Sequence, residues 1–283
     1  MGVGDTTSLS SNALHALNAA DIILGAEHHF VSLNDGRANK NFNAKEIPYA
    51  SPFSEVKQQL LSLSGRVVVL ASGDSLFFGI GQWIYTNFSD LEPTFHANVS
   101  SIQAACHLIS KAWQTLTVLT AHGRPLNNIH SKLKNNTLYG LLTDKNSQPK
   151  DVALILRQAG FEDTQLWICE AIGTHKQRVT QCLVKELLVQ DAKNDKSNDL
   201  PTEFHPLHVI IFETSGAGKI LPEFPGISDT SFSTDGDKQG SGLLTKKEVR
   251  LNILSLLQPT AGDIGWDVGA GCGGVSVEWA HWN

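Results

Sequence analysis

A glycine-rich run late in the sequence combines residue types that bind nucleotide cofactors. Asp267 stands two residues before Gly269, and Gly271 and Gly273 follow at two-residue spacing. Glycines permit a tight turn between a strand and a helix, because they adopt positive φ and carry no side chain. The N–H groups of the next helix can then bind an anionic or polar cofactor. Alone, the run leaves three interpretations open: a methyltransferase that uses S-adenosylmethionine, a dinucleotide-binding fold, or a turn without a ligand.

A second set of candidate ligand-binding residues follows a strongly apolar stretch. The residues RVVVLA at 66–71 predict a strand buried on both faces of a parallel sheet. Ser72, Gly73 and Asp74 come directly after it, and the carboxyl ends of parallel strands are where α/β sheets bind ligands. Asp74 has two possible roles, which are contact with a ligand and capping of the next helix through its backbone N–H groups.

Two further segments carry polar side chains at the ends of expected elements. Ser100 and Ser101 open an expected helix at 101–113, where a plain N-cap is the simpler interpretation and ligand binding the alternative. His122 and Arg124 follow an expected strand at 116–120, and both could bind carboxylates. As isolated residues, they would more often be solvated.

The elements that must position these residues alternate between strands and helices. Further helices are expected at 10–20, 79–87 and 150–159, and further strands at 22–24, 137–142, 166–170, 175–183 and 208–213. This pattern predicts an α/β fold throughout. Before the glycine run, we expect a helix at 246–257 with Thr245 and Glu248 as a capping box, then a strand at 264–268.

The composition limits the classes of protein to consider. A chain of 283 residues with 41% hydrophobic residues suggests one large or two small domains. A net charge of −6 argues against nonspecific binding of nucleic acid. The four cysteines lie far apart without a C-x-x-C pair, so neither a metal site nor a disulfide framework is expected, and each is interpreted as a small buried apolar residue. Without a secretory signal or a long apolar run, we expect a soluble, cytoplasmic protein that does not enter a membrane.

Taken in order, the motifs resemble the tetrapyrrole methylases of cobalamin biosynthesis. The resemblance rests on GVGD at 2–5, ASGDSLFFGIG at 71–81, VSSIQAA at 99–105, TAHGRPL at 120–126 and EAIGTHKQRV at 170–179. Three later motifs resemble members in which two methyltransferases are fused: LPEFPGISD at 221–229, LLTKKEVR at 243–250 and WDVGAGCGGVSVEWA at 266–280. The order and spacing of these motifs make the resemblance more specific than any one of them.

The resemblance implies an α/β fold of two lobes, the class III methyltransferase type, with S-adenosylmethionine between the lobes and usually a homodimer. The lobes would take residues of about 1–105 and 106–213, and a linker would follow at 214–242. The start of a Rossmann-like methyltransferase domain would occupy 243–283. We expect most of that domain, and the first strand of the first lobe, to be missing from this sequence.

The resemblance also implies which residues bind the cofactor. The matching positions are Asp5, Ser72, Gly73, Asp74, Phe77, Ser100, Ser101, His122 and Gly173, with Asp267, Gly269, Gly271 and Gly273 in a second, incomplete site. The chain departs from the usual family pattern at Ser75, where proline is frequent, and at Ala97 and Asn98, where proline and glycine are frequent.

The implied reaction is transfer of a methyl group to carbon-5 of an anionic precorrin or cobalt-precorrin. Because a sulfonium is already an activated leaving group, catalysis should consist mostly of alignment, and no catalytic residue is assigned. His28, His29 and Arg124 are candidates for binding substrate carboxylates. Methylation of carbon-15 and decarboxylation would be lost with the second domain. The alternatives are a dinucleotide-binding oxidoreductase, inferred from the glycine run alone, and an inactive fragment of a broken gene.

Overall fold

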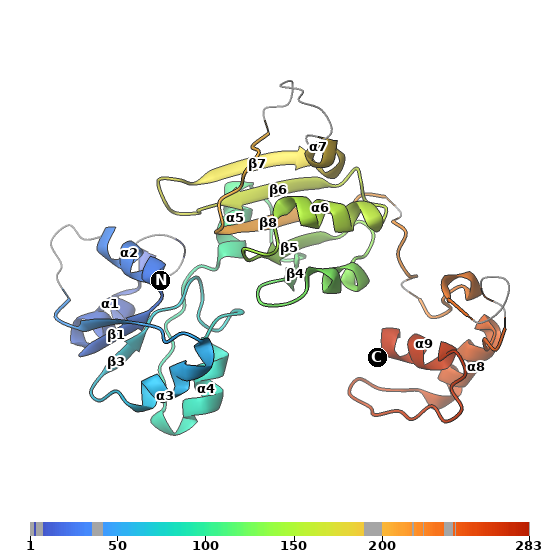
Figure 1. Cartoon of the computed structure of the whole chain (residues 1–283), viewed down its shortest axis with the longest axis horizontal. Coiled ribbons are helices and arrows are strands. Elements are labelled where there is room, and N and C mark those ends of the chain that lie inside the picture. The colour runs from blue at the N-terminus through green and yellow to red at the C-terminus, as the bar shows by residue number, and fades with distance from the viewer. Residues whose placement is uncertain are drawn as a thin grey trace. The chain divides into compact units, whose positions relative to one another are not determined.

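Two separate sheets organise the structure, which is a computed structural model (Figure 1). It describes residues 3, 8–35, 42–189, 200–216, 218–222, 224–234, 240 and 242–282. The chain divides into two compact units, Met1–Gly218 and Lys219–Asn283, and both sheets belong to the first. Asp5 lies outside the described residues.

A three-stranded parallel sheet forms the N-terminal part of the first unit. Its order is β2 (Lys45–Pro48), β1 (Ile22–Gly25) and β3 (Val67–Val69). Four helices accompany it: α1 (Ser11–Ala19), α2 (Glu27–Asp35), α3 (Val56–Leu61) and α4 (Gly81–Phe88). Leu17 of α1 and Leu33 of α2 pack with Ile23 of β1 and Leu70 in one apolar cluster, which fixes both helices on the sheet.

The third strand is shorter and less buried than its sequence predicts. The apolar run at 66–71 predicts burial on both faces, whereas the three valines of β3 are only half-buried. Its parallel pairing with β1 agrees with the prediction. In the described part of the chain β3 stands at the edge of the sheet, and an edge strand is covered less completely than the central β1, where Ile23 and Leu24 are fully buried.

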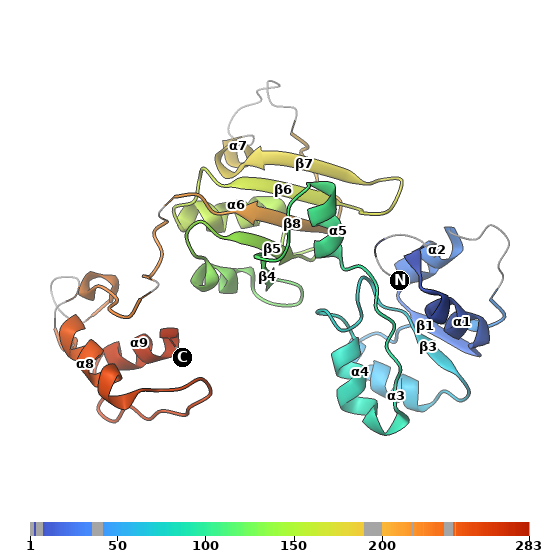
Figure 2. The same ribbon diagram turned by 180° about the vertical axis from the view of Figure 1, so that it is seen from behind.

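A five-stranded mixed sheet forms the rest of the first unit (Figure 1). Its order is β4 (Thr117–Thr120), β5 (Leu138–Leu142), β8 (His208–Glu213), β6 (Gln165–Glu170) and β7 (Arg178–Leu183). β4 and β5 run parallel, and every other neighbouring pair is antiparallel. Figures 1 and 2 show α6 (Pro149–Gln158) and α5 (Ser101–Leu108) on opposite faces of this sheet. The short helix α7 (Val184–Val189) follows β7.

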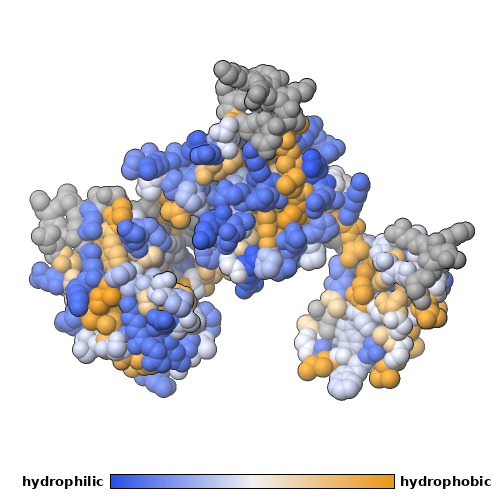
Figure 3. Space-filling view, viewed as in Figure 1, coloured by the Kyte–Doolittle hydropathy of each residue, from blue (hydrophilic) through white to orange (hydrophobic). Residues whose placement is uncertain are grey.

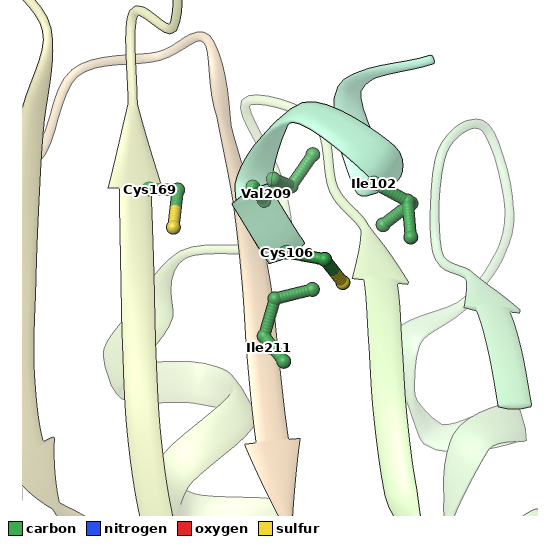
Figure 4. Close-up of a cluster of buried hydrophobic side chains, with 6 residues drawn as sticks. Ile102, Cys106, Cys169, Val209 and Ile211 are labelled. Carbon is green, nitrogen blue, oxygen red and sulfur yellow. The ribbon is translucent and has the colours of Figure 1, made fainter. Parts of the chain in front are cut away.

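The helix α5 anchors one face of this sheet and ends earlier than expected. Ile102 and Cys106 pack against Cys169, Val209 and Ile211 of the strands (Figure 4). The expected helix ran to residue 113, but α5 ends at Leu108 because Ser110 adopts a φ of +54°. The N–H groups of Ser110 and Lys111 then donate to the carbonyls of His107 and Cys106, the two bonds of a Schellman motif.

Three of the four cysteines are buried free thiols, as expected for small apolar residues. Burial raises the pKa of Cys169 to about 12 and that of Cys182 to about 11, so both stay protonated near neutral pH. Cys106 is the third, and only Cys272 is partly exposed. Within the described residues, no group of three or more His, Cys, Asp or Glu side chains could hold a metal ion.

The described part of the second unit contains two α-helices, α8 (Lys247–Leu257) and α9 (Gly274–Trp282), and a 3-10 helix at Asp229–Ser231. The strand expected at 264–268 is wrong, since these residues form no strand pairing and Ile264, Trp266 and Val268 are each nearly 90% exposed. The physical reason is the lack of a neighbour, because a strand is held by bonds to a second strand and the described part of this unit contains none. No helix in the described residues is long and apolar enough to cross a membrane.

The capping box expected at the start of α8 is also wrong. The N-cap is Lys246, and no side chain bonds to the cap. The carbonyl of Thr245 instead accepts a hydrogen bond of 2.6 Å from Nη1 of Arg250, which draws this residue into the unit's interior. Ile227 and Phe232 are buried beside Leu244, so part of the segment expected as a linker packs within the second unit.

Candidate functional site

The loop after β3 brings Ser72 against two histidines of α2. Ser72 Oγ lies 2.9 Å from His29 Nε2 and 3.2 Å from His28 Nε2. His29 Nδ1 accepts the backbone N–H of Ala26 at 3.1 Å. A ring nitrogen that accepts a hydrogen bond carries no proton, so neutral His29 holds its proton on Nε2 and donates it to Ser72. The hydroxyl hydrogen of Ser72 is then free to point at His28.

Both histidines are neutral near pH 7. Burial, followed by the nearby His28, lowers the pKa of His29 to about 3, and its side chain is only 6% exposed. Loss of solvent also lowers the pKa of His28, although that residue remains exposed. The two rings lie 4.1 Å apart between centroids. His29 therefore lacks both the charge and the access needed to bind a substrate carboxylate, the role expected from the sequence.

Gly73 brings the same loop against the start of α5. Its φ is +62°, and a Cβ placed there would lie 3.3 Å from Cα of Ser100 and 3.6 Å from N of Ser101. A glycine therefore lets the two backbones approach closely. The structure thus joins two of the segments that the sequence indicated as cofactor-binding.

Ser100 acts as the N-cap of α5. Its Oγ accepts the N–H of Gln103 at 3.2 Å, and Gln103 Oε1 accepts the N–H of Ser100 at 2.9 Å. These two bonds make a capping box, so the simpler of the two interpretations of Ser100 is confirmed. The N–H of Ser101 lies at the first turn of α5 beside Gly73, where helix N–H groups have no partner within the helix.

Asp74 stabilises its own loop and does not cap the next helix. Its Oδ1 accepts the N–H of Leu76 at 2.8 Å, whereas α4 begins at Gly81 with Ile80 as N-cap. The expectation that Asp74 caps this helix is therefore wrong, because the loop inserts several residues between them. The rings of Phe77 and Phe78 meet edge to face at 5.0 Å, and both are exposed. Phe78 has a φ of +55°, which is rare for a bulky side chain.

The register of the mixed sheet brings His122 and Gly173 to the same edge. Thr120 pairs with Leu142, Leu142 with Val209, and Val209 with Cys169, so the ends of β4, β5 and β6 form one row. His122 follows β4, and Gly173 follows β6 with a φ of +77°. Within the described residues, no hydrogen bond or ion pair joins these two residues to Ser72 or Gly73.

The turn that carries His122 is held by the loop after β5. Asp144 Oδ2 accepts the N–H of Gly123 at 2.9 Å, and this bond is the main reason that the pKa of Asp144 is lowered. His122 Nδ1 lies 3.3 Å from the carbonyl oxygen of Thr143. The neighbouring Arg124 is exposed and brings a positive charge to this edge of the sheet.

A buried carboxylate that the sequence did not single out fixes the turn of Gly173. Glu170 is 1% exposed and binds Arg178 through two bonds of 2.7 Å, and it also accepts the N–H of His205. Burial alone would raise the pKa of Glu170, but Arg178 and the N–H of His205 outweigh it and lower the pKa. Both residues lie within the motif at 170–179, but only the hairpin of β6 and β7 shows that they pair.

The glycine run of the second unit forms the turn that its residue types predict. Gly269, Gly271 and Gly273 adopt φ values of +81°, +58° and +72°. Asp267 accepts the hydroxyl hydrogen of Ser276 in α9. Gly274 lets the start of α9 pack closely, since a Cβ there would lie 2.9 Å from Cδ1 of Leu244.

A cavity of about 560 Å³ has none of the candidate cofactor-binding residues in its lining. It is lined by Arg178, Val179, Thr180, Gln181, Glu186, Leu200 and Pro201. The two charged residues of its lining already have partners: Arg178 is paired with Glu170, and Glu186 accepts the N–H of Leu183. The candidate site is therefore defined by the contacts of Ser72 and Gly73 and not by this cavity.

Comparison with protein families identifies two regions of the chain. Residues 1–188 match the model of tetrapyrrole (corrin/porphyrin) methylases, and residues 235–283 match the model of a precorrin methyltransferase domain. Among solved structures, a uroporphyrin-III C-methyltransferase from Thermus thermophilus complexed with S-adenosylhomocysteine is similar over 75% of this chain and 93% of its own. The TM-score is 0.55 at 17% identity, which supports a common fold.

Two curated relatives illustrate the range of similarity. The precorrin-6Y C(5,15)-methyltransferase [decarboxylating] of Sinorhizobium sp is 30% identical over 99% of this chain, but the chain spans only 63% of that relative's length. The cobalt-precorrin-7 C(5)-methyltransferase of Salmonella typhimurium is 22% identical over 63% of this chain and 86% of its own length.

Proposed function

Since the chain belongs to the family of tetrapyrrole (corrin/porphyrin) methylases, we propose that it methylates carbon-5 of a precorrin or cobalt-precorrin with S-adenosylmethionine. The observation that carries this proposal is the contact between Gly73 and the start of α5. It brings together the loop after β3 and the segment of Ser100 and Ser101, two of the places where family members bind the cofactor. A dinucleotide-binding oxidoreductase needs neither segment.

The residues around this contact fit the cofactor chemically. The missing side chain of Gly73 allows close approach to its backbone, and the N–H of Ser101 is a donor at the first turn of a helix. Phe77 offers an exposed ring to the flat adenine, and Asp74 holds this loop in shape. We propose that His122 and Gly173 contribute from their sheet edge, in the positions implied by the family.

Bound S-adenosylmethionine supplies an activated methyl group, so the protein needs to align the two reactants and exclude water. Carbon-5 of the substrate would receive this methyl group. Arg124 is proposed to bind a carboxylate of the anionic macrocycle, because it is exposed and positively charged. Neutral His29 is not assigned to that role.

Carbon-5 is favoured over carbon-15 because the folded site lies in the first unit. Residues 1–188 carry the match to the tetrapyrrole methylases, and a relative named for C(5) methylation aligns over 86% of its length. In the second unit, the residues around the glycine run are exposed, and the described part of that unit holds no strand to support them. We propose a cytoplasmic homodimer on the family resemblance, which sedimentation would detect as twice 30.7 kDa.

Three experiments test the proposal. Calorimetry should detect binding of S-adenosylmethionine and none of NADH; the reverse result would favour the oxidoreductase. Incubation with S-adenosylmethionine and the precorrin substrate, with or without cobalt, should give a product heavier by one methyl group at carbon-5. A product with two added methyl groups and loss of carbon dioxide would contradict the assignment to carbon-5 alone. Arg124→Ala should raise KM for the precorrin and leave binding of S-adenosylmethionine unchanged.

A further inference from the structure

Three side chains at the candidate site form a hydrogen-bonded chain with a defined direction. The N–H of Ala26 fixes Nδ1 of His29 as an acceptor, so His29 Nε2 is the donor to Ser72 Oγ. Ser72 then has one hydrogen left, and His28 Nε2, 3.2 Å away, accepts it when the proton of the neutral His28 ring is on Nδ1. In that tautomer the chain ends at His28 Nε2, whose electron pair accepts the hydrogen of Ser72, on a histidine that is exposed to solvent.

The proposed reaction needs a proton acceptor, and this inference rests on that proposed function. When the ring carbon attacks, a carbon–carbon bond forms and the carbon–sulfur bond breaks, with its electron pair remaining on sulfur. The methylated carbon still carries its hydrogen, and the ring regains its conjugation only when that hydrogen leaves as a proton. A positioned general base typically contributes a factor of about 10² to 10⁴ to such a step.

We propose that Ser72 and His28 accept this proton as a relay, with His29 as the residue that positions Ser72. Ser72 Oγ takes the proton from the ring carbon while its own hydrogen passes to His28 Nε2. The carbon–hydrogen bond breaks, its electron pair returns to the ring, and Ser72 is neutral again. His28 ends as an imidazolium and releases the proton to solvent. The bond from His29 Nε2 stabilises the oxygen of Ser72 during the transfer.

The surroundings of the two rings suit this direction of transfer. Among the described residues, Tyr49 also faces these rings. Its ring lies 6.5 Å from that of His29, and burial raises its pKa, so it stays neutral. The positive charge of the N-terminal amine adds to the lowering of the pKa of His29. Lowered pKa values keep His28 and His29 unprotonated before the reaction. Ser72 is exposed beside Gly73, at the loop proposed to hold the cofactor.

The arrangement itself can be tested without substrate by ¹⁵N NMR of the histidine rings. At pH 7, His29 should be neutral with its proton on Nε2. Ser72→Ala removes the hydrogen-bond partner of His28 Nε2 and should therefore shift the ¹⁵N resonance of that nitrogen, while the ring resonances of His15, on the exposed side of α1, should stay in place. A His29 protonated on Nδ1 would overturn the relay, because Ser72 would then have to donate to His29.

The catalytic role is tested with His28→Gln and Ser72→Ala, with His15→Gln as the control. His28→Gln and His15→Gln should bind S-adenosylmethionine as the parent does, within about threefold, which shows that the loop is folded. Ser72→Ala removes a hydroxyl from the proposed cofactor loop, so its effect is judged by its pH profile and isotope effect. His28→Gln should lose about 100-fold or more in kcat and also lose the fall in rate at acid pH that protonation of His28 causes. A deuterium on the methylated carbon should slow both variants more than the parent.

The outcomes separate the relay from the proposed function. If the parent protein transfers no methyl group, the proposed function is contradicted. If the parent is active and His28→Gln keeps both its kcat and its acid limb, the relay alone is overturned. A lower kcat in Ser72→Ala with an unchanged pH profile and no added isotope effect would reduce Ser72 to a structural residue and also overturn the relay.

Discussion

The two units of the chain are held together in different ways. In the first unit, α5 and the strands bury an apolar cluster that includes Ile102, Val209 and Ile211 (Figure 4). In the second unit, the apolar cluster found among the described residues has three buried members, and a buried guanidinium lies over the ring of one of them, Phe232. Figure 3 shows hydrophobic residues at the surface of the second unit, where Leu256 and Ile264 are among the exposed ones.

The buried guanidinium of the second unit belongs to Arg250. It binds Glu278 of α9 at 3.1 Å and Asp229 at 2.7 Å, and it donates to the carbonyls of Thr245 and Ile227. Glu278 in turn accepts the N–H groups of Gly226 and Ile227. A small unit buries too little apolar surface to be stable by packing alone. The second unit is therefore stabilised mainly by buried ion pairs and hydrogen bonds, whereas the first unit is stabilised mainly by apolar packing.

The largest effect should come from Arg250→Ala. Removing one partner of a buried ion pair leaves the other charge unpaired and costs about 3–5 kcal/mol. We expect residues 226–282 to exchange their amide hydrogens freely while the first unit keeps its protection. Lys246→Ala is the control, because the Lys246–Asp229 pair is half-exposed and 4.0 Å long, so its loss should be small. If the amide hydrogens of both units stayed equally protected in Arg250→Ala, the second unit would not depend on its buried ion pairs, and the proposed difference between the units would be wrong.

The reciprocal substitution is Ile211→Ala in the first unit. Ile211 is fully buried in the cluster against α5, so its truncation should cost about 2–5 kcal/mol in the free energy of unfolding of the first unit. Urea denaturation followed by far-UV circular dichroism measures this loss. The exposed Val179 of β7 provides a control, since its truncation should change stability little. Loss of the second unit's structure in Ile211→Ala would show that the units are not independent.

Protonation of His29 at acid pH should lower the free energy of unfolding of the first unit, which contains this residue, and not that of the second. Its pKa is lowered from 6.5 to about 3, so the unfolded chain binds a proton that the folded chain does not. The contribution of His29 to the free energy of unfolding is therefore fully present above pH 6.5, and it is lost progressively as the pH drops from 6.5 toward 3. At pH 5 the loss is about 2 kcal/mol. His29→Asn should flatten the change of Tm between pH 7.5 and 5, and an unchanged slope would contradict the neutral, buried state of His29.

The smallest expected effect belongs to Asp74. Asp74→Ala removes the acceptor of the Leu76 N–H and should cost about 1 kcal/mol of loop stability. Because this loop is proposed to hold the cofactor, binding of S-adenosylmethionine should weaken by roughly fivefold. Asp74→Asn retains an oxygen at the same place and should bind nearly as the parent does. Unchanged affinity and Tm in Asp74→Ala would show that the loop keeps its shape without this bond.

Sequence patterns predicted the mixed sheet well and the first sheet less well. Strands such as 166–170 and 208–213 carry apolar runs, and the structure contains both within one residue. β2 was missed because Lys45–Pro48 is mostly exposed and has no apolar alternation. The strand expected at 264–268 failed for another reason, since its residues suit a strand but pairing requires a neighbour.

The candidate site was predictable in part. The family resemblance pointed to the loop of Ser72 and to Ser100, and the approach of Gly73 to Ser100 agrees with it. The bonds from His28 and His29 to Ser72 could not be predicted, because they join residues 44 and 43 positions apart. They depend on the parallel pairing of β1 with β3, which places α2 beside the loop after β3. The pair of Glu170 and Arg178 was missed for another reason: these residues are eight positions apart, and only the register of the β6–β7 hairpin places them opposite each other.

The exposed indole of Trp266 gives the second unit an optical signal of its own. Trp266 is 87% exposed, whereas the ring of Trp279 packs closely against the backbone of Gly265. An indole in water emits at long wavelength and is readily quenched by iodide. A ligand or polypeptide that covers the residues beside the glycine run would therefore shift this emission to the blue and protect it from the quencher. The difference between the parent and Trp266→Phe spectra would report such an event without any label.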